Sequence, residues 1–360
     1  MNDSSRGAPP HAGYGGPPGQ GPARPPAAGP PHGADDTAQT RPMPIVPPAG
    51  GDQDDRDGHH RGAARPSGPP VHENGPAGAH PSPATPPRKR AGRDLRAAIG
   101  VGVGLGAVIL ASLFFVKDVF VAVIVAAVVV GLWELTSRLR EQKGIRAPLV
   151  PLAAGGVAMV VAGYLRGPEG AWVAMALTAL AVLAWRMTDD PRDYLRDVTA
   201  GLFAAFYVPF LATFVALMLA AGDGARWVLV FLLLTVVSDT GAYAVGWRFG
   251  THKLAPRISP GKTREGLLGA VGSAMVAGAL CMEFLIDGGS WWEGLLLGLA
   301  VAGSATLGDL GESMIKRDLG IKDMGTLLPG HGGIMDRLDS LLPTAPVAWL
   351  LLVVFTGSGD

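Results

Sequence analysis

Long apolar runs separated by short charged breaks constrain the fold of this chain more than any other feature. Nine runs from Ala97 onward are candidate membrane spans. They cover residues 97–116, 119–133, 147–165, 171–186, 200–220, 227–247, 266–286, 294–309 and 341–356. Some are shorter than the ~20 residues that cross a hydrocarbon core, so we expect their ends to extend into polar flanks. The pattern predicts an all-α, polytopic membrane protein with about nine transmembrane helices.

The cations between these runs predict how the spans are oriented. With the N-terminus inside, 21 Lys and Arg residues fall in the inside breaks, and only Lys117, Arg166 and Arg226 fall in the outside breaks. Cytoplasmic loops of membrane proteins carry an excess of Lys and Arg. We therefore expect a multi-pass protein of the cell (plasma) membrane with a cytoplasmic N-terminus and an outside C-terminus. The breaks 248–265 and 310–340 then share the cytoplasmic face, where they can form one active site.

The first 87 residues have a different composition from the rest. They contain 21 of the 31 prolines and six of the eight histidines, but few large apolar side chains. Such a segment cannot bury enough apolar surface to offset the entropy lost on ordering. We predict a disordered Pro/Gly/Ala-rich cytoplasmic tail over residues 1–87 and a transmembrane domain over residues 88–360. The whole chain has 30 Lys plus Arg and 30 Asp plus Glu, a balance that does not favour nucleic acid as a partner.

Most of the chemically distinctive residues lie in one segment, Ser313–Asp339, between two apolar runs. Asp336 and Asp339 are three residues apart, so on a helix both carboxylates face one side. With Asp309, which ends the preceding apolar run, they could supply the oxygen ligands that Mg²⁺ prefers. Lys316 and Arg317 offer positive charge for phosphate oxygens.

The glycine-rich part of this segment, Gly330–Gly333, is predicted to be a turn whose N–H groups could bind an anion. We expect His331 to have a phosphate-binding or turn role ahead of the alternatives, a metal ligand or a general acid. A salt-bridged cytoplasmic loop is the structural alternative for the whole segment.

A second segment, Ser238–Gly266, adds further candidates. Asp239 lies near the end of an apolar run, where a carboxylate is either functional or paired with a neighbouring helix. Ser259–Thr263 precedes another apolar run, and such a loop at a helix N-terminus suits phosphate capture. Lys262 and Arg264 also fit as cytoplasmic anchors of the following span. The spacing does not match a P-loop.

Ser313–Asp339 resembles the signature of the phosphatidate cytidylyltransferase (CDP-diacylglycerol synthase) family. Asp239–Tyr243 and Ile258–Gly266 resemble the family's other stretch, with departures at Gly261 and Arg264. The resemblance covers about residues 238–342, the expected catalytic portion. The signature residues, in order and without a gap, are Ser313, Lys316, Arg317, Lys322, Asp323, Gly325, Pro329, His331, Gly332, Gly333, Asp336, Arg337 and Asp339.

The resemblance implies a helical membrane enzyme that transfers CMP from CTP to phosphatidic acid, giving CDP-diacylglycerol and pyrophosphate. It also implies Mg²⁺, a second cation for which K⁺ is the candidate, and a homodimer. The predicted catalytic residues are Asp309, Lys316, Arg317, Asp336 and Asp339, with Asp309, Asp336 and Asp339 as metal ligands. The predicted phosphate- or substrate-binding residues are Ser259, Lys262, Ser313, Lys322, His331, Gly332, Gly333 and Arg337, and the further candidates are Asp239 and Asp323.

Two other kinds of function remain as alternatives. A related CTP-dependent polyprenol kinase or another lipid cytidylyltransferase would use the same kind of site with a different substrate. An ion-coupled transporter would place its carboxylates near the bilayer midplane, often within inverted repeats. Here the carboxylates lie at the predicted cytoplasmic ends of late spans, which favours the enzyme.

We predict that the tail is dispensable for catalysis, because its composition does not support a packed structure. A chain that starts at Arg88 keeps the basic flank that sets the orientation of the first span. Its rate of lipid-linked CMP formation, at equal abundance in membranes, should equal that of the full chain. A loss of specific activity would contradict this prediction.

Overall fold

The structure is a computed structural model that describes residues 91–325, 327 and 332–357. The chain divides into two units, Met1–Ser82 and Pro83–Asp360, and all described residues belong to the second. The predicted tail, residues 1–87, lies outside the described residues, so its disorder and its boundary remain predictions.

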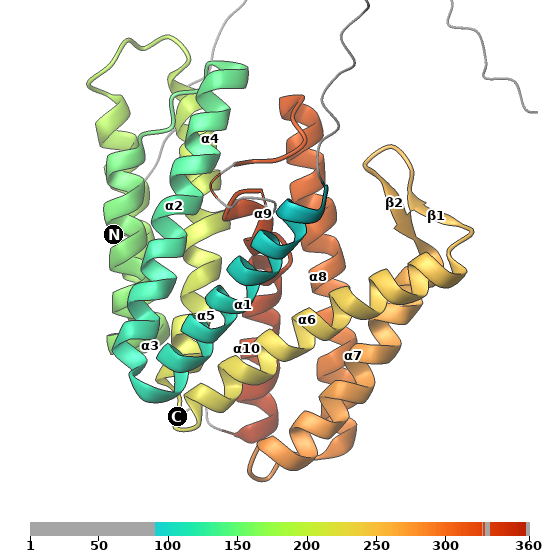
Figure 1. The fold of residues 1–360 in the computed structure, drawn as a ribbon. Coiled ribbons are helices and arrows are strands. Elements are labelled where there is room, and N and C mark those ends of the chain that lie inside the picture. Colours follow the sequence, from blue (N-terminus) through green and yellow to red (C-terminus); the bar gives the residue numbers. More distant parts are fainter. Residues whose placement is uncertain (1–90, 326, 328–331, 358–360) are drawn as a thin grey trace, which may run out of the picture. The chain divides into compact units, whose positions relative to one another are not determined.

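The described residues are almost entirely helical, which confirms the all-α prediction apart from one small β-hairpin (Figure 1). The hairpin pairs two antiparallel strands, with Lys253 opposite Thr263 and Ala255 opposite Ser259. The elements in order are α1 Ala91–Phe115, α2 Lys117–Lys143, α3 Leu149–Arg186, α4 Tyr194–Ala205, the π-helical turn η1 Phe206–Phe210, α5 Leu211–Ala220, α6 Gly224–Phe249, β1 Lys253–Ala255, β2 Ser259–Thr263, α7 Arg264–Leu285, α8 Trp291–Leu319, α9 Met335–Leu338 and α10 Leu341–Thr356.

Seven helical segments of the described chain are long and apolar enough to cross a membrane. They are Lys117–Lys143, Leu149–Arg186, Tyr194–Ala220, Gly224–Phe249, Arg264–Leu285, Trp291–Leu319 and Met335–Thr356. The apolar part of α1, Gly106–Phe115, is shorter. The polytopic helical fold is therefore confirmed, whereas the count of nine spans stays a prediction.

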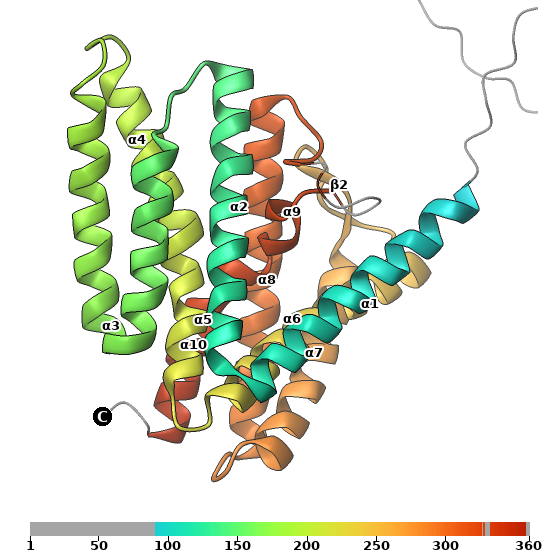
Figure 2. The same cartoon turned by 60° about the vertical axis from the view of Figure 1, so that its left-hand side comes forward.

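Helix α3 is a hairpin of two antiparallel arms. A straight helix of its 38 residues would be about 57 Å long, far more than a bilayer core. Gly167 interrupts it with φ 68° and ψ −157°, immediately before Pro168. A Cβ added to Gly155 on the first arm would lie 2.1 Å from Oγ1 of Thr178 on the second, so the arms pack directly together. Figure 2 shows them side by side. The predicted runs 147–165 and 171–186 correspond to these two arms.

Ion pairs show which breaks share an end of the bundle. Lys143, at the end of α2, pairs with Asp318, at the end of α8, at 3.3 Å. At the opposite end, Arg226 at the start of α6 pairs with Asp287 after α7 at 2.7 Å. The first pair joins two breaks predicted to be inside, and the second joins two predicted to be outside. The alternation of breaks thus agrees with the bundle, while the side of the membrane remains a prediction.

Small residues bring α6, α7 and α8 close together. A Cβ added to Gly241 on α6 would lie 2.1 Å from Oγ of Ser273 on α7. Where α7 meets α8, a Cβ added to Gly278 would lie 2.2 Å from the carbonyl oxygen of Gly294, and one added to Gly298 would lie 2.1 Å from that of Ala274. Small residues are common where membrane helices approach closely. This packing fixes the position of α6 relative to α8, the two helices that carry Asp239 and Asp309.

We predict that Gly155→Val destabilises the chain, because the added methyl groups meet Thr178 and force the α3 arms apart. Overpacking of this kind costs about 1–3 kcal/mol. Gly272→Val on α7 is the matched control, since a Cβ there meets nothing within 4 Å. The midpoint of thermal unfolding in detergent should fall for Gly155→Val well below that of the control. Equal midpoints would show that the α3 arms do not pack as described.

Candidate active site

A cavity of about 480 Å³ lies between α6, the β-hairpin, α7 and α8. Its wall combines apolar side chains with a few polar groups, two of them carboxylates and one an ammonium group. The polar side chains that line it are Ser238, Asp239, Tyr243, Lys262, Thr263, Thr306 and Asp309. A mainly apolar pocket with a few convergent charged groups is the usual form of a small-molecule site.

The β-hairpin places Lys262 in this cavity. Thr263 ends β2 and caps α7, its hydroxyl oxygen accepting a hydrogen bond of 3.1 Å from the N–H of Gly266. Arg317 of α8 donates from Nε to the carbonyl oxygen of Ile258 at 3.2 Å, which holds the hairpin against α8. Lys262 forms an ion pair with Asp309. The sequence predicted a phosphate-binding loop here, and the structure has a strand that presents the same lysine.

Asp309 shares the cavity with a second carboxylate, that of Asp239 on α6. Asp339, which follows α9, does not line the cavity. Ser313 donates a hydrogen bond to Asp309 at 3.4 Å, and Ser340 donates one to Asp239 at 3.3 Å. Asp239, only a further candidate from the sequence, therefore belongs to the cavity beside Asp309.

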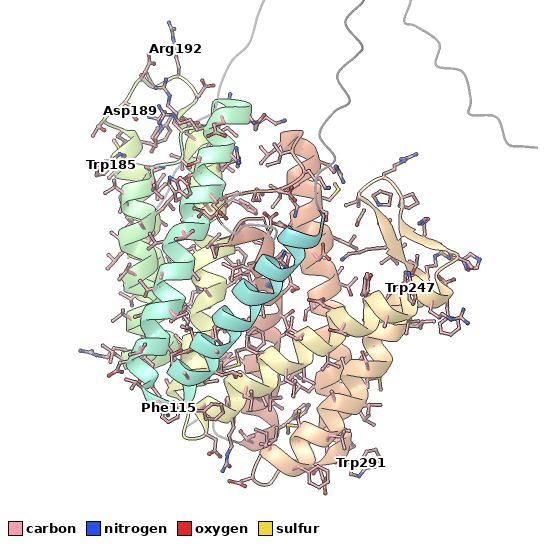
Figure 3. The ribbon with its side chains drawn as sticks, viewed as in Figure 1. Phe115, Trp185, Asp189, Arg192, Trp247 and Trp291 are labelled. Atoms are coloured by element: carbon pink, nitrogen blue, oxygen red, sulfur yellow. The ribbon has the colours of Figure 1, made fainter. Side chains whose placement is uncertain are left out.

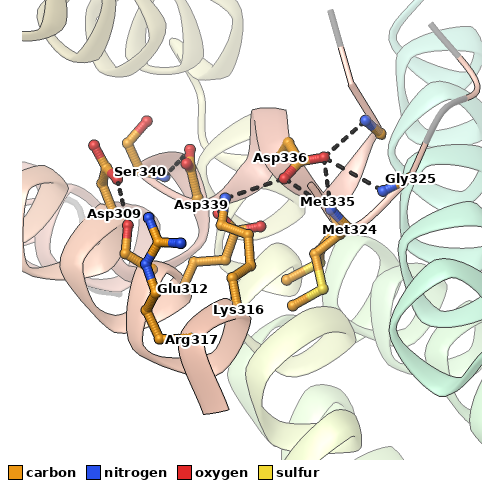
Figure 4. A network of polar contacts seen from close by, with 12 residues as sticks. Asp309, Glu312, Lys316, Arg317, Met324, Gly325, Met335, Asp336, Asp339 and Ser340 are labelled. Carbon is orange, nitrogen blue, oxygen red and sulfur yellow. Dashed lines mark hydrogen bonds and ion pairs between the residues drawn. The ribbon is translucent and has the colours of Figure 1, made fainter. Parts of the chain in front are cut away.

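Asp336 belongs to a neighbouring network (Figure 4). Its carboxylate accepts hydrogen bonds from the backbone N–H groups of Met324 at 3.0 Å and Gly333 at 2.8 Å. Lys316 lies 3.1 Å from it, and the same ammonium group lies 2.5 Å from Glu312. Asp336 thus shapes the segment between α8 and α9, a role that the sequence did not predict for it.

Glu134 of α2 is a buried carboxylate that the sequence analysis missed, and it supports the segment before α9. It is 2% exposed and accepts a hydrogen bond of 2.8 Å from the N–H of Met335. A Cβ added to Gly325 or Gly333 would lie 2.0 Å or 2.5 Å from its carboxylate oxygens, so only glycine fits at either position. The sequence did contain a signal for Glu134, because this carboxylate follows directly on an apolar run, the same feature that singled out Asp239.

The predicted metal ligands do not form one cluster. In the part of the chain that the structure describes, no three His, Cys, Asp or Glu side chains are grouped closely enough to hold a metal ion. The carboxylate oxygens of Asp336 already have partners, the ammonium group of Lys316 and backbone N–H groups. Mg²⁺ usually needs only one or two carboxylates besides substrate phosphates and water. Asp239 and Asp309, which line the cavity, have the chemistry for that arrangement, and metal binding by these residues remains a prediction.

The other predicted residues fall in different places. Lys322 and Asp323 are exposed just after α8, and Arg337 is exposed on α9. Ser259 lies on β2 and does not line the cavity. Gly332 has φ 78°, a conformation that favours glycine. His331 lies outside the described residues. The phosphate-binding roles predicted for these residues stay predictions.

The fold and the site together define a polytopic helical membrane protein whose cavity, near one end of its spans, holds two carboxylates and a lysine. Residues 96–355 match the cytidylyltransferase family, and the chain belongs to that family. It is therefore a nucleotidyltransferase, as the resemblance of Ser313–Asp339 implied.

Named relatives cover most of the chain. The phosphatidate cytidylyltransferase of Mycobacterium bovis is 42% identical over 290 residues, which are 77% of this chain and 94% of the relative. That of Mycobacterium leprae is 42% identical over 281 residues, 74% of this chain and 89% of the relative. That of Staphylococcus saprophyticus is 33% identical over 190 residues, 51% of this chain and 72% of the relative.

We predict that Asp336→Asn destabilises the segment between α8 and α9. The amide presents an NH₂ group to backbone donors and leaves the ammonium group of Lys316 without one of its counter-charges. Leaving buried polar groups unsatisfied costs about 1–3 kcal/mol each. Asp318→Asn is the control, because that side chain is 76% exposed and surface ion pairs contribute little.

Two quantities are measured in detergent: the rate at which a protease cleaves the segment that follows residue 319, and the midpoint of thermal unfolding. Asp336→Asn should be cleaved faster and unfold earlier than Asp318→Asn. Indistinguishable variants would contradict the scaffold role of Asp336.

Proposed function

We propose that this chain transfers CMP from CTP to phosphatidic acid, giving CDP-diacylglycerol and pyrophosphate. The observation that carries the proposal is the cavity in which Lys262 pairs with Asp309, near one end of the spans. Membership of the cytidylyltransferase family and relatives named phosphatidate cytidylyltransferase support it.

The reaction needs charge neutralisation more than an activated nucleophile. A phosphomonoester has a second pKa near 6, so the phosphatidate oxygen is already anionic at neutral pH. That oxygen forms a bond to the α-phosphorus of CTP, while the bond from this phosphorus to the leaving pyrophosphate breaks. Lys262 is suited to the incoming phosphates, because a phosphate oxygen can replace Asp309 as its partner. The role of the cavity is then to hold two polyanions in line.

Mg²⁺ is part of the proposal, with K⁺ as the candidate second cation. Asp239 and Asp309 would hold Mg²⁺ beside the phosphates, and Asp339 lies within electrostatic range of Asp309. A bound metal ion would stabilise the charge that develops on the transferred phosphoryl oxygens. The protein side chains orient the phosphates and balance the charge that remains.

The position of the cavity suits a lipid acceptor. Asp309 lies ten residues before the end of α8, about 15 Å along the helix axis. Tyr243 and Trp247 line the cavity and are 73% and 78% exposed. Figure 3 shows Trp247 beside the β-hairpin. Aromatic side chains of this kind lie at headgroup level in membrane proteins. The diacyl chains would stay in the bilayer while the headgroup meets CTP from the cytoplasm. We propose that the chain lies in the cell membrane with its N-terminus and active site on the cytoplasmic side and its C-terminus outside. We also propose that it assembles as a homodimer.

The competing function is a kinase that transfers the γ-phosphate of CTP to a lipid alcohol. Purified full-length chain should therefore be given CTP labelled at the α- or the γ-phosphate, with phosphatidate or a polyprenol as acceptor. The proposal expects α-label in lipid with phosphatidate alone, and no activity in the presence of a chelator. γ-Label in lipid would show a kinase and would overturn the proposal.

We predict that Asp309→Asn lowers kcat for CMP transfer about 100- to 1,000-fold. The substitution keeps the shape of the side chain but removes the charge that holds Lys262 and balances the site, and preorganised electrostatics of this kind has that magnitude. Asp287→Asn, which removes a carboxylate paired with Arg226 at the opposite end of the bundle, is the matched control and should retain activity. Both are measured across a Mg²⁺ titration. Equal rates for the two variants would exclude Asp309 from the site.

A further inference from the structure

A second polar cavity, of about 550 Å³, lies away from the candidate active site. It is formed where the end of α2, the 144–148 loop and both ends of α3 meet. The residues that carry its chemistry are Trp133, Arg140, Arg146, Trp185, Arg186 and Asp189. Arg140 and Arg146 are exposed cations with no carboxylate partner among the described residues. None of these residues lines the active-site cavity.

Buried ion pairs hold this cavity in one shape. Arg186 is 3% exposed and binds Asp197, which is 2% exposed, at 2.8 Å. Asp197 also accepts a hydrogen bond of 3.0 Å from the backbone N–H of Arg146, which fixes the 144–148 loop. Arg186 binds Asp189 at 2.5 Å, yet its buried Nε has no hydrogen-bond partner in the described structure. The cavity therefore has a buried, fixed cation in its wall.

The charges of this cavity favour an anion. Arg186 contacts both Asp189 and Asp197, and its single charge balances one of these two carboxylates. Arg140 and Arg146 also line the cavity, so three guanidinium groups stand against two carboxylates and the local charge is positive by one. Guanidinium groups bind phosphate oxygens in a forked, bidentate geometry. A phosphate group is thus the ligand class that this cavity suits.

An apolar groove lies along the α3 hairpin, next in sequence to residues of the polar cavity on both arms. Its volume is about 710 Å³, and it is lined largely by small and aliphatic residues of the two arms, among them Ala158 and Leu177. On the first arm Pro151 lines the groove, and Pro148, three residues earlier, lines the polar cavity. On the second arm Ala181 lines the groove, and Trp185, four residues later, lines the polar cavity. Residues four apart share a helix face, so Ala181 and Trp185 place the groove and the cavity on one side of the second arm.

We propose that the arginine cavity and the α3 groove together bind one phospholipid with an anionic headgroup. The phosphate would lie among Arg140, Arg146 and Arg186, and an acyl chain would lie along the groove. Trp133 and Trp185, which are 47% and 49% exposed, flank the cavity at the level where tryptophans meet lipid headgroups. Figure 3 shows Trp185 and Asp189 together at this end of α3, with Arg192 farther out. The site is separate from the proposed catalytic cavity and does not depend on its function.

The test is lipid binding to the purified full-length chain, followed by native mass spectrometry in detergent. Phosphatidylglycerol is the probe, and phosphatidylcholine is the zwitterionic reference. Wild type should retain one phosphatidylglycerol in preference to phosphatidylcholine. Arg140→Gln and Arg146→Gln should each weaken this binding about fivefold, since a cation near an anionic headgroup contributes about that factor. Arg192→Gln is the matched control, an exposed cation of the same end that does not line the cavity, and it should bind as wild type does.

A second variant tests the groove without changing charge. Ala158→Phe fills the groove and should lower retention of phosphatidylglycerol while the oligomeric mass stays the same. Three results would overturn the proposal. The first is equal binding by Arg140→Gln, Arg146→Gln and Arg192→Gln. The second is displacement of the lipid by inorganic phosphate at equimolar amounts, which would indicate a free-phosphate site. The third is a changed oligomeric mass in Ala158→Phe with unchanged lipid binding, which would indicate that the groove is a protein interface.

Discussion

The two ion pairs of Lys316 are the interaction on which the segment between α8 and α9 depends. The ammonium group of Lys316 lies between Glu312, whose side chain is fully buried, and Asp336, whose side chain is 9% exposed. Removing one partner of a buried ion pair costs about 3–5 kcal/mol, because it leaves a charge without compensation. Asp336 in turn accepts hydrogen bonds from the backbone before α9, and the N–H of Met335 binds Glu134 of α2. One lysine therefore couples the end of α8 to the following segment and, through it, to α2.

The carboxylates at this end of the bundle are of two kinds, which differ in their hydrogen-bond and ion-pair partners. Glu134 and Asp336 are held by backbone N–H groups of the protein itself, so their charge stabilises a chain path. Asp239 and Asp309 face the cavity, and each accepts a hydrogen bond from one hydroxyl group. Asp309 also pairs with the ammonium group of Lys262. A buried charge with fixed partners is poorly suited to exchange ligands, whereas a cavity-lining charge with replaceable partners can do so. This difference separates the scaffold from the groups available for chemistry.

The sequence predicted the helical fold well, because apolar length is a local property that the bilayer makes decisive. It predicted separate runs at 147–165 and 171–186, which the structure joins as the arms of one α3 hairpin turned at Gly167. The β-hairpin was missed, since Ser259-Pro260-Gly261 is equally typical of a loop. Asp309 and Lys262 were chosen as candidates from their local setting, and the structure brings them together in one cavity. Glu134 and the scaffold role of Asp336 were not predicted, because both depend on pairing with backbone groups that only the folded chain brings near.

The glycines of the signature segment also have partners within the protein. The N–H of Gly333 donates to the carboxylate of Asp336, while the expected binding of a substrate anion by Gly332 and Gly333 stays a prediction. Gly325 and Gly333 are also the positions where a Cβ would strike Glu134. Gly333 thus donates to the carboxylate of Asp336, and both glycines leave room for the carboxylate of Glu134. Lys262 lies in the cavity formed by α6 and the β-hairpin, outside the densest part of the signature. Differences in acceptor preference among such enzymes should accordingly reside in the cavity wall of α6 and β2.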